Sequence, residues 1–186
     1  VREKWETSQN PWVYNASAAY DSLFSENEWG HAIREIRRLD PTFTMDGFAL
    51  EMRDELVPEI VSAFLRGDRD ALSARCSERA MAQLSAALRQ REAEGLTVDP
   101  NILSINNVDV KAAQVREKGP SVLVFQVMVQ QINCTRNRKG EIVEGKDDEI
   151  RAVYYAFAVH RVYNSTTLEL EWRIDEMAIV GAVLYL

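Results

Sequence analysis

The sequence predicts an α+β protein in which helices pack on one face of a curved antiparallel sheet. Two observations support this class: helical periodicity fills the first half of the chain, and alternation with β-branched residues fills the second. The change falls between Gly95, which ends a helix running from Ser77 to about Glu94, and Pro100. Because helices and strands are segregated along the chain, we do not expect a parallel βαβ sheet.

The composition is that of an ordinary folded protein with one core. The 186 residues are 46% hydrophobic and 27% charged, which is enough to bury a core without disulfides. The net charge is -7 and no long basic block occurs, which disfavours a nucleic-acid partner. Cys76 and Cys134 lie outside any ligand motif, so we expect buried thiols in a reducing compartment.

No window approaches the ~18 consecutive apolar residues of a membrane span. The chain begins at Val1 without a transit-like segment, which predicts a processed chain or one domain.

Two amphipathic helices are predicted at the start of the chain. The first covers residues 11–25, because Pro11 suits a first helical turn and apolar residues then recur at three- and four-residue spacing. Its stripe consists of Trp12, Ala16, Ala19, Tyr20, Leu23 and Phe24. The second covers residues 26–38, with an acidic start and a basic end that suit the helix dipole. Its stripe is Trp29, Ile33 and Ile36, and its basic residues are Arg34, Arg37 and Arg38. We expect residues 1–40 to form a docking unit ahead of a body in residues 41–186.

A central buried helix should follow, because its apolar residues widen from a stripe to most of the circumference. Asp46 can cap it, and Pro58 predicts a kink or restart since proline lacks a backbone donor. Gly67 should end this helix, and Asp68 should cap a short helix that runs through Ala74.

The second half predicts four long strands. We expect them around residues 102–110, 121–136, 150–162 and 168–184, with a charged connection at residues 144–149. One face of the second strand should carry Leu123, Phe125, Val127 and Val129. Strict alternation on the fourth strand would place Trp172, Ile174, Glu176 and Ala178 on one face, and Arg173, Asp175, Met177 and Ile179 on the other.

Motifs for catalysis are weak, and we expect no enzyme, cofactor or metal site. Neither nucleotide-binding loop nor nucleophile elbow occurs, and two histidines with two cysteines cannot supply a recognisable ligand set. A hollow in the sheet could still hold a general base, with Asp109, Asp175, Glu176 and His160 as candidates. The alternative is a surface pair of Arg173 with Asp175. Gln126, Gln130 and Gln131 could line the hollow, but an antiparallel sheet more often turns such residues to solvent.

The two amphipathic helices are the most informative feature, and their periodicity fits two interpretations equally. Aromatic rings along one helix face suit a membrane interface, where ring bodies reach the acyl boundary and polar edges stay wet. The same stripe suits packing on the body or on a partner chain.

Five stretches together resemble a known family across almost the whole chain. They are Ser8-Gln9-Asn10-Pro11, Leu39-Asp40-Pro41-Thr42-Phe43, Leu56-Val57-Pro58-Glu59-Ile60 with Gly67-Asp68, Gln131-Ile132-Asn133 and Gly140-Glu141-Ile142. The family is the Tim-forty-four family, and the resemblance is to the C-terminal domain of this peripheral subunit of the mitochondrial inner-membrane presequence translocase.

The resemblance implies a nuclear-transport-factor-like cone and a non-enzymatic, peripheral adaptor on the matrix side of the mitochondrial inner membrane. It implies contact with a cardiolipin-containing membrane surface, with presequence translocase subunits and with preproteins. It also implies that the complete protein tethers a DnaK-type matrix chaperone, mainly through a part that precedes this domain.

The resemblance further assigns membrane contact to the two N-terminal helices. The residues implied are Trp12, Tyr20, Leu23, Phe24, Trp29 and Ile33, with Arg34, Arg37 and Arg38 near lipid phosphate. Since the first helix has no lysine or arginine, the electrostatic part must come from the second, at about 1 kcal/mol per cation near an anionic surface.

Two alternatives stay open at this point. A mitochondrial ribosomal large-subunit protein of the same superfamily would show a basic, RNA-contacting surface, which the acidic balance disfavours. A small-molecule enzyme or binding module of the same cone would show a buried acid with a pKa near neutrality.

Overall fold

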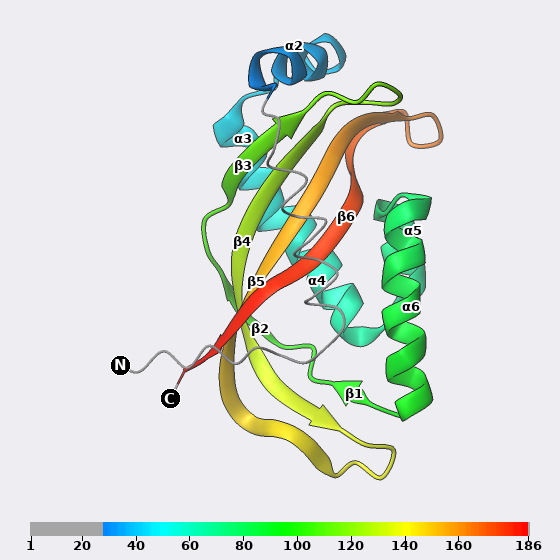
Figure 1. The fold of residues 1–186 in the computed structure, drawn as a ribbon, viewed down its shortest axis with the longest axis vertical. Helices are drawn as coiled ribbons and strands as arrows, with labels where there is room; N and C mark the ends of the chain where they lie inside the picture. The colour runs from blue at the N-terminus through cyan, green and yellow to red at the C-terminus, as the bar shows by residue number, and fades with distance from the viewer. Residues whose placement is uncertain (1–27, 186) are drawn as a thin grey trace.

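The expected α+β cone is confirmed. The structure, a computed structural model, describes residues 28–185, in which a six-stranded antiparallel sheet curls into a half-barrel around helices (Figure 1). The helices are α2 (Trp29–Leu39), α3 (Met45–Glu51), α4 (Val57–Arg66), α5 (Arg69–Arg75) and α6 (Glu78–Glu94). The strands are β1 (Thr97–Val98), β2 (Ile102–Ile105), β3 (Asp109–Gln114), β4 (Val122–Arg136), β5 (Ile142–Asn164) and β6 (Glu169–Leu184). The predicted helix over residues 11–25 lies outside the described residues.

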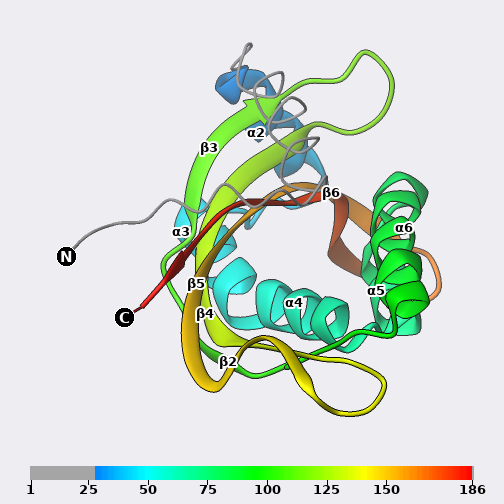
Figure 2. The same cartoon turned by 60° about the horizontal axis from the view of Figure 1, so that its bottom comes forward.

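Strand β4 is the central strand of the sheet. One side of β4 pairs with β5, which in turn pairs with β6, and the other side pairs in succession with β1, β2 and β3. Figure 2 shows the sheet curving around α4, which lies within the curve. The face of β4 that the alternation predicted is confirmed, because its four residues all join the main core. They are Leu123, Phe125, Val127 and Val129.

Two strand predictions need correction. The single strand expected over residues 102–110 is two strands, β2 and β3, separated at residues 106–108, where two asparagines, which are poor strand formers, stand. The charged segment 144–149 is not a connection but part of β5. Its backbone pairs with the end of β4, at Cys134 with Gly145 and Thr135 with Glu144. Charged side chains suit this segment because it lies at an edge of the sheet.

The helical half follows its local signals closely, with two corrections. Thr44, not Asp46, is the N-cap of α3, and its hydroxyl accepts a hydrogen bond from the Gly47 N–H at 3.1 Å. Helix α2 begins at Trp29 with no acidic residue in its first turn. The restart expected at Pro58 is confirmed: a π-helical turn, Met52–Leu56, precedes α4, and Pro58 lies in the first turn of that helix.

Both predicted glycine stops are present. Gly67 and Gly95 adopt left-handed conformations with φ of 74° and 68°, at the ends of α4 and α6. The next helix begins directly after Gly67, because the Asp68 carboxylate accepts from the Ala71 N–H at 3.1 Å.

The core is built from aromatic rings that join the helices to the concave face of the sheet. Phe48 of α3 meets the Trp172 ring edge-on, with centroids 4.8 Å apart, and the Phe125 ring with centroids 5.7 Å apart. Phe125 in turn stacks on Phe157 of β5 at 5.1 Å. Because helix and strand residues share these contacts, the helical and sheet layers form one core.

The strict alternation expected on β6 is wrong. Register shifts in its pairing with β5 leave Asp175 and Val180 without Cα partners. Each extra residue reverses which side chains face the core. The core-facing set is therefore Trp172, Ile174, Met177, Ile179 and Ala182, which combines members of both predicted faces.

Candidate functional site

Helix α2 closes one end of the half-barrel and is fixed there by hydrogen bonds to the sheet. The Glu28 N–H donates to the Ala113 carbonyl of β3 at 3.1 Å. The Glu35 carboxylate accepts from the Ser121 N–H at 3.4 Å and from the Ser121 hydroxyl. These contacts hold one face of the helix against the body and leave the opposite face to solvent.

The inner face of α2 packs on the core. Ala32 is fully buried and Ile36 is 2% exposed. Trp29 and Ile33 are partly buried and pack against the same core residues. Two of the residues implied in membrane contact therefore also serve the packing of α2 on the body, and each offers only part of its surface to any partner.

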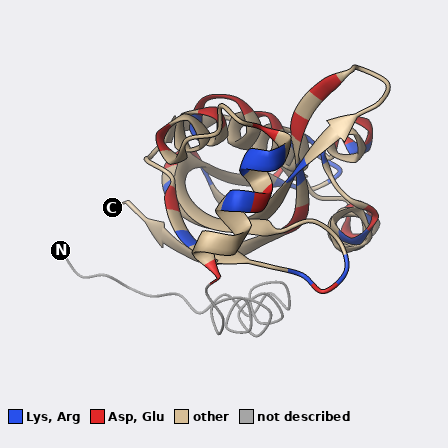
Figure 3. Cartoon of the chain, turned by 90° about the horizontal axis from the view of Figure 1, so that it is seen from above, with Lys and Arg blue, Asp and Glu red and all other residues tan. Residues whose placement is uncertain are grey.

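The outer face of α2 carries its basic residues. Arg34, Arg37 and Arg38 are all exposed, and we refer to them as the basic face of α2. Figure 3, viewed from this end of the molecule, shows the basic segments of α2 turned toward the viewer. Within residues 28–185, Arg34 and Arg38 form no ion pair, while the Arg37 Nε donates to the Phe43 carbonyl at 3.4 Å. At least two guanidinium groups are thus available to an external anion.

An ionic cluster, largely buried at Arg161 and Asp40 and open to solvent at Glu51, supports the C-terminal end of α2. Arg161 of β5 donates to Asp40, directly after α2, at 2.9 Å and to Glu51 of α3 at 3.3 Å. Its guanidinium lies 5.0 Å from the centroid of the Trp172 ring, and the Trp172 indole N–H donates to Glu51 at 3.1 Å. The cluster ties two helices to two strands at one point.

The Asp40 carboxyl stays ionised in this cluster. The hydrogen bond from the Thr42 hydroxyl, at 2.7 Å, lowers the pKa of Asp40, and the charge of Arg161 lowers it further against the opposing effect of burial. Sequence reasoning missed this cluster. Its signal was Arg161 near the end of the apolar run of β5, since a charged residue in a largely buried part of a strand requires a partner.

The four candidate acid–base residues do not converge in one place. Asp109 is exposed and pairs with Lys111, and Glu176 pairs with Arg79. Asp175 and His160 do come together, with the carboxylate 2.7 Å from the His160 Nδ1.

Asp175 is buried and ionised. Arg116 also pairs with it at 2.9 Å, so the expected surface pair of Asp175 with Arg173 is wrong. Burial alone would raise the pKa of Asp175, but the hydrogen bond and charge of His160 and the charge of Arg116 outweigh it and lower that pKa. A general base needs a pKa raised toward neutrality, so the shift runs in the wrong direction for that role.

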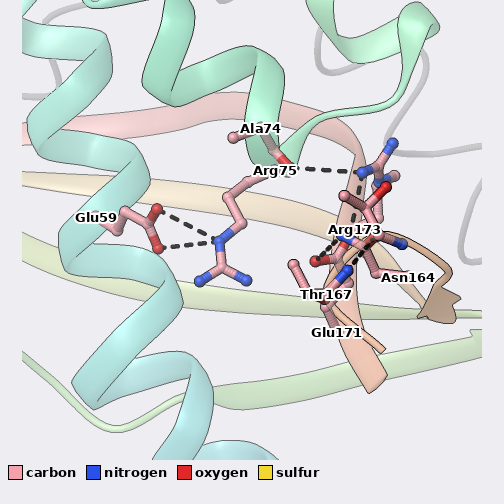
Figure 4. Close-up of polar contacts among 8 residues, drawn as sticks. Glu59, Ala74, Arg75, Asn164, Thr167, Glu171 and Arg173 are labelled. Atoms are coloured by element: carbon pink, nitrogen blue, oxygen red, sulfur yellow. Dashed lines mark hydrogen bonds and ion pairs between the residues drawn. The ribbon is translucent and has the colours of Figure 1, made fainter. Parts of the chain in front are cut away.

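Arg173 instead joins the helical layer to the β5–β6 hairpin (Figure 4). Its guanidinium pairs with Glu171 at 3.0 Å and donates to the Ala74 carbonyl of α5 at 3.5 Å. Nearby, Arg75 pairs with Glu59 of α4 at 3.1 Å. These contacts are structural, and they clamp α5 against the sheet.

The three glutamines are not a group lining one hollow. Gln131 is buried and accepts from the Tyr155 hydroxyl at 2.9 Å, while Gln130 bonds to Ser104 and Tyr185. Gln126 is half-buried. Both cysteines are buried and free, as expected. Among residues 28–185 no group of three metal-ligating side chains gathers, and no helix is long and apolar enough to cross a membrane.

Four residues implied in membrane contact lie outside the described part of the chain. They are Trp12, Tyr20, Leu23 and Phe24. Their role and the boundary expected at residue 40 stay predictions. The described part of the site is the basic face of α2, on a helix that the core and the ionic cluster of Arg161, Asp40 and Glu51 hold in place.

These features define an α+β cone domain that presents a basic helix at one end, and comparison with known proteins gives its family. The family model described as the Tim44-like domain matches residues 29–179. The chain therefore belongs to the Tim44-like family.

Relatives of known name support the same assignment. The chain is 31% identical over 185 residues to mitochondrial import inner membrane translocase subunit TIM44 of Homo sapiens, covering 96% of this chain and 41% of that protein. It is 30% identical to subunit TIM44-1 of Arabidopsis thaliana, covering 97% of this chain and 39% of that protein. It thus spans about two fifths of the length of these relatives. Among solved structures, the intermembrane space region of chloroplast protein ARC6 aligns with a TM-score of 0.41 and 12% identity over 69% of this chain and 97% of that one.

Proposed function

We propose that this domain is a non-enzymatic adaptor of mitochondrial protein import that binds the matrix side of the inner membrane through α2 and the segment before it. Family membership supplies the import role, since the named relatives are subunits of the inner-membrane import translocase. The observation that carries the membrane contact is the exposed basic face of α2, with guanidinium groups that no described carboxylate neutralises.

The ligand that fits this face is the phosphate of an anionic lipid such as cardiolipin. Guanidinium groups bind phosphate oxygens in a bidentate manner, and Arg34 and Arg38, four residues apart, project from the same side of α2. Three cations contribute about 3 kcal/mol near an anionic surface. That is too little for stable anchoring, so apolar contacts from the stripe of residues 11–25 are needed as well.

The net charge of the molecule restricts how it can approach such a surface. With a total of -7, most faces are repelled by anionic lipid, and the basic face of α2 offers a local exception. Binding in this orientation turns the distal end of the half-barrel away from the membrane. We assign contacts with translocase subunits and preproteins to that remaining surface. Tethering of a DnaK-type chaperone belongs to the complete protein, of which this chain matches about two fifths.

The test is co-flotation of the 186-residue chain with liposomes that contain or lack cardiolipin. The variant is Arg34→Gln/Arg38→Gln, which removes two charges from exposed positions and leaves the core face of α2 intact. The matched control is Arg66→Gln/Arg89→Gln, which makes the same charge change at exposed positions on α4 and α6. We expect cardiolipin-dependent flotation that falls at least fivefold in the first variant and is retained in the control. Equal flotation of both variants would overturn the assignment to α2.

The apolar contribution is tested separately. Replacing Trp12, Tyr20, Leu23 and Phe24 with serine should abolish flotation at moderate salt while the melting temperature stays within a few degrees of the parent. Flotation that survives this change would show that the aromatic stripe does not enter the membrane, and would redirect the search to protein partners by crosslinking.

A further inference from the structure

The C-terminal half of β6 forms a sheet edge to which no described residue hydrogen-bonds. At its start, the edge is occupied, because the Ser77 N–H donates to the Ile174 carbonyl at 2.7 Å and Cys76 forms a parallel bridge with Ile174. Beyond that point β6 pairs with β5 on one side, and within residues 28–185 nothing hydrogen-bonds its other side from Met177 to Leu184. Alternate residues of an edge strand direct their N–H and C=O groups outward, so this segment presents a row of backbone donors and acceptors that no residue of 28–185 pairs with.

The composition of this edge differs from that of the neighbouring edge of β5. The segment Met177–Leu184 contains no charged residue and no proline. The neighbouring free edge of β5 at residues 142–149 carries five charged residues, Glu144, Lys146, Asp147, Asp148 and Glu149. Charge on an exposed edge is a standard protection against pairing with other chains. One edge is protected in this way and the other is not.

We propose that the β6 edge, Met177–Leu184, is a docking site for an extended, uncharged polypeptide segment of another protein, which adds to the sheet as an antiparallel strand. Backbone hydrogen bonds supply the affinity in this mode of recognition, so the partner is selected by its extended, neutral character more than by its sequence. Ile179 and Ala182 already pack against the core on the concave side, and apolar side chains of the added strand would extend that surface. Val180 lies in a bulge of this edge and has no Cα partner on β5.

A second copy of this chain is the less favoured occupant. Each copy carries a net charge of -7, and a dimer joined along one strand would bring two acidic bodies together for a small buried area. A short neutral segment adds no such repulsion. The inference goes beyond the proposed membrane role and is tested without lipid, so the two can fail independently.

The test uses the 186-residue chain and a capped octapeptide of alternating threonine and valine as a neutral, extended probe. Amide hydrogen exchange is followed by NMR with and without the peptide. We expect outward amides within Met177–Leu184 to gain at least tenfold protection, while residues 142–149 do not change. A peptide of the same sequence with N-methyl groups on alternate residues keeps the side chains but cannot pair on that edge, and it should give no protection.

Two variants complete the experiment. Val180→Lys places a charge on the proposed edge at a residue without a cross-strand partner, and Val143→Lys places the same charge on the exposed, already charged edge of β5. Peptide binding should fall at least tenfold in the first and stay unchanged in the second. Absence of protection in the parent protein, or equal binding of both peptides, would overturn the proposal. A dimer that is detected by sedimentation and that Val180→Lys dissociates would also overturn the proposal, because the edge would then bind a second copy of the chain.

Discussion

Arg161 shows how one residue can determine where a helix lies on a sheet. Its guanidinium bonds to Asp40 and Glu51 and lies over the Trp172 ring, so it fixes the end of α2, α3 and two strands together. The arginine side chain is 11% exposed, and its loss would leave two carboxylates with no charge partner beside the core.

We predict that Arg161→Met destabilises the fold by about 3 kcal/mol, because breaking a buried ion pair leaves uncompensated charge. Urea unfolding followed by tryptophan fluorescence measures the change. Arg53→Met is the matched control, since Arg53 pairs with Asp54 on the surface and its removal should have little effect. Similar losses in both variants would show that the buried cluster has no special role in stability.

The Asp175 pair predicts acid sensitivity. The folded-state pKa of Asp175 lies below the ordinary value of 3.8, so its contribution to stability is present above that value and is lost as pH falls through the lower, folded pKa. We expect the free energy of unfolding to decline below about pH 4, and to decline less steeply in Asp175→Asn. Urea unfolding at pH values from 7 to about 3 measures this slope. Asp109→Asn, at an exposed site, should leave the slope nearly unchanged, and a parental slope in Asp175→Asn would contradict the prediction.

At the scale of elements, the β4–β5 hairpin depends on one glycine. Gly145 has φ of +71°, and a Cβ at this position would lie 1.6 Å from the Asn133 carbonyl oxygen of β4. Gly140, nearer the hairpin tip, has φ of +81° but open space around it. The two positions therefore separate the effect of backbone strain from that of a steric clash.

We predict that Gly145→Ala lowers the melting temperature clearly more than Gly140→Ala. The second variant should cost about 1–2 kcal/mol for the left-handed conformation, and the first should add the displacement of β5 from β4. Thermal unfolding measured by circular dichroism compares them. Equal shifts would mean that the hairpin relaxes around the added methyl group without loss of strand pairing.

Elements set by local signals could be predicted from the sequence, and those set by long-range pairing could not. The caps at Asp68 and Ser77, the stops at Gly67 and Gly95 and the restart at Pro58 depend on neighbours in the chain, and all are present. The bulges of β6 depend on register with β5, which alternation within one strand does not encode. For the same reason sequence reasoning separated Asp175 from Arg116, which lies 59 residues away.

The same division applies to the candidate site. The basic residues of α2 were predicted from the sequence, and all three are exposed in the structure. The packing of Trp29 and Ile33 on the core was one of two interpretations left open, because an amphipathic stripe has the same period whether lipid or protein covers it.

At the scale of the whole molecule, α2 closes one end of the half-barrel, and the β6 edge runs along its side (Figure 1). The two proposed surfaces are therefore separate. A membrane contact at α2 and an added strand on β6 involve different residues, so each can be disabled without the other.

We predict that cardiolipin-dependent flotation weakens as salt rises, and that the difference between the parent and Arg34→Gln/Arg38→Gln shrinks in parallel. The reason is that contacts between exposed guanidinium groups and lipid phosphate are screened once the Debye length falls below about 10 Å. Flotation at a series of salt concentrations measures both quantities. A difference that stays constant with salt would show that the two arginines act through folding of α2 and not through charge.

The parallel bridge between Cys76 and Ile174 has a practical consequence for following motion. Cys76 is buried at the junction of α5 and α6 with β6, and burial raises the pKa of its thiol to about 12, so the folded protein should react slowly with a thiol reagent. Labelling can then proceed only when this junction opens. In a Cys134→Ser background, the rate of maleimide incorporation at Cys76 measures how often the helix pair separates from the sheet, and no cysteine has to be introduced.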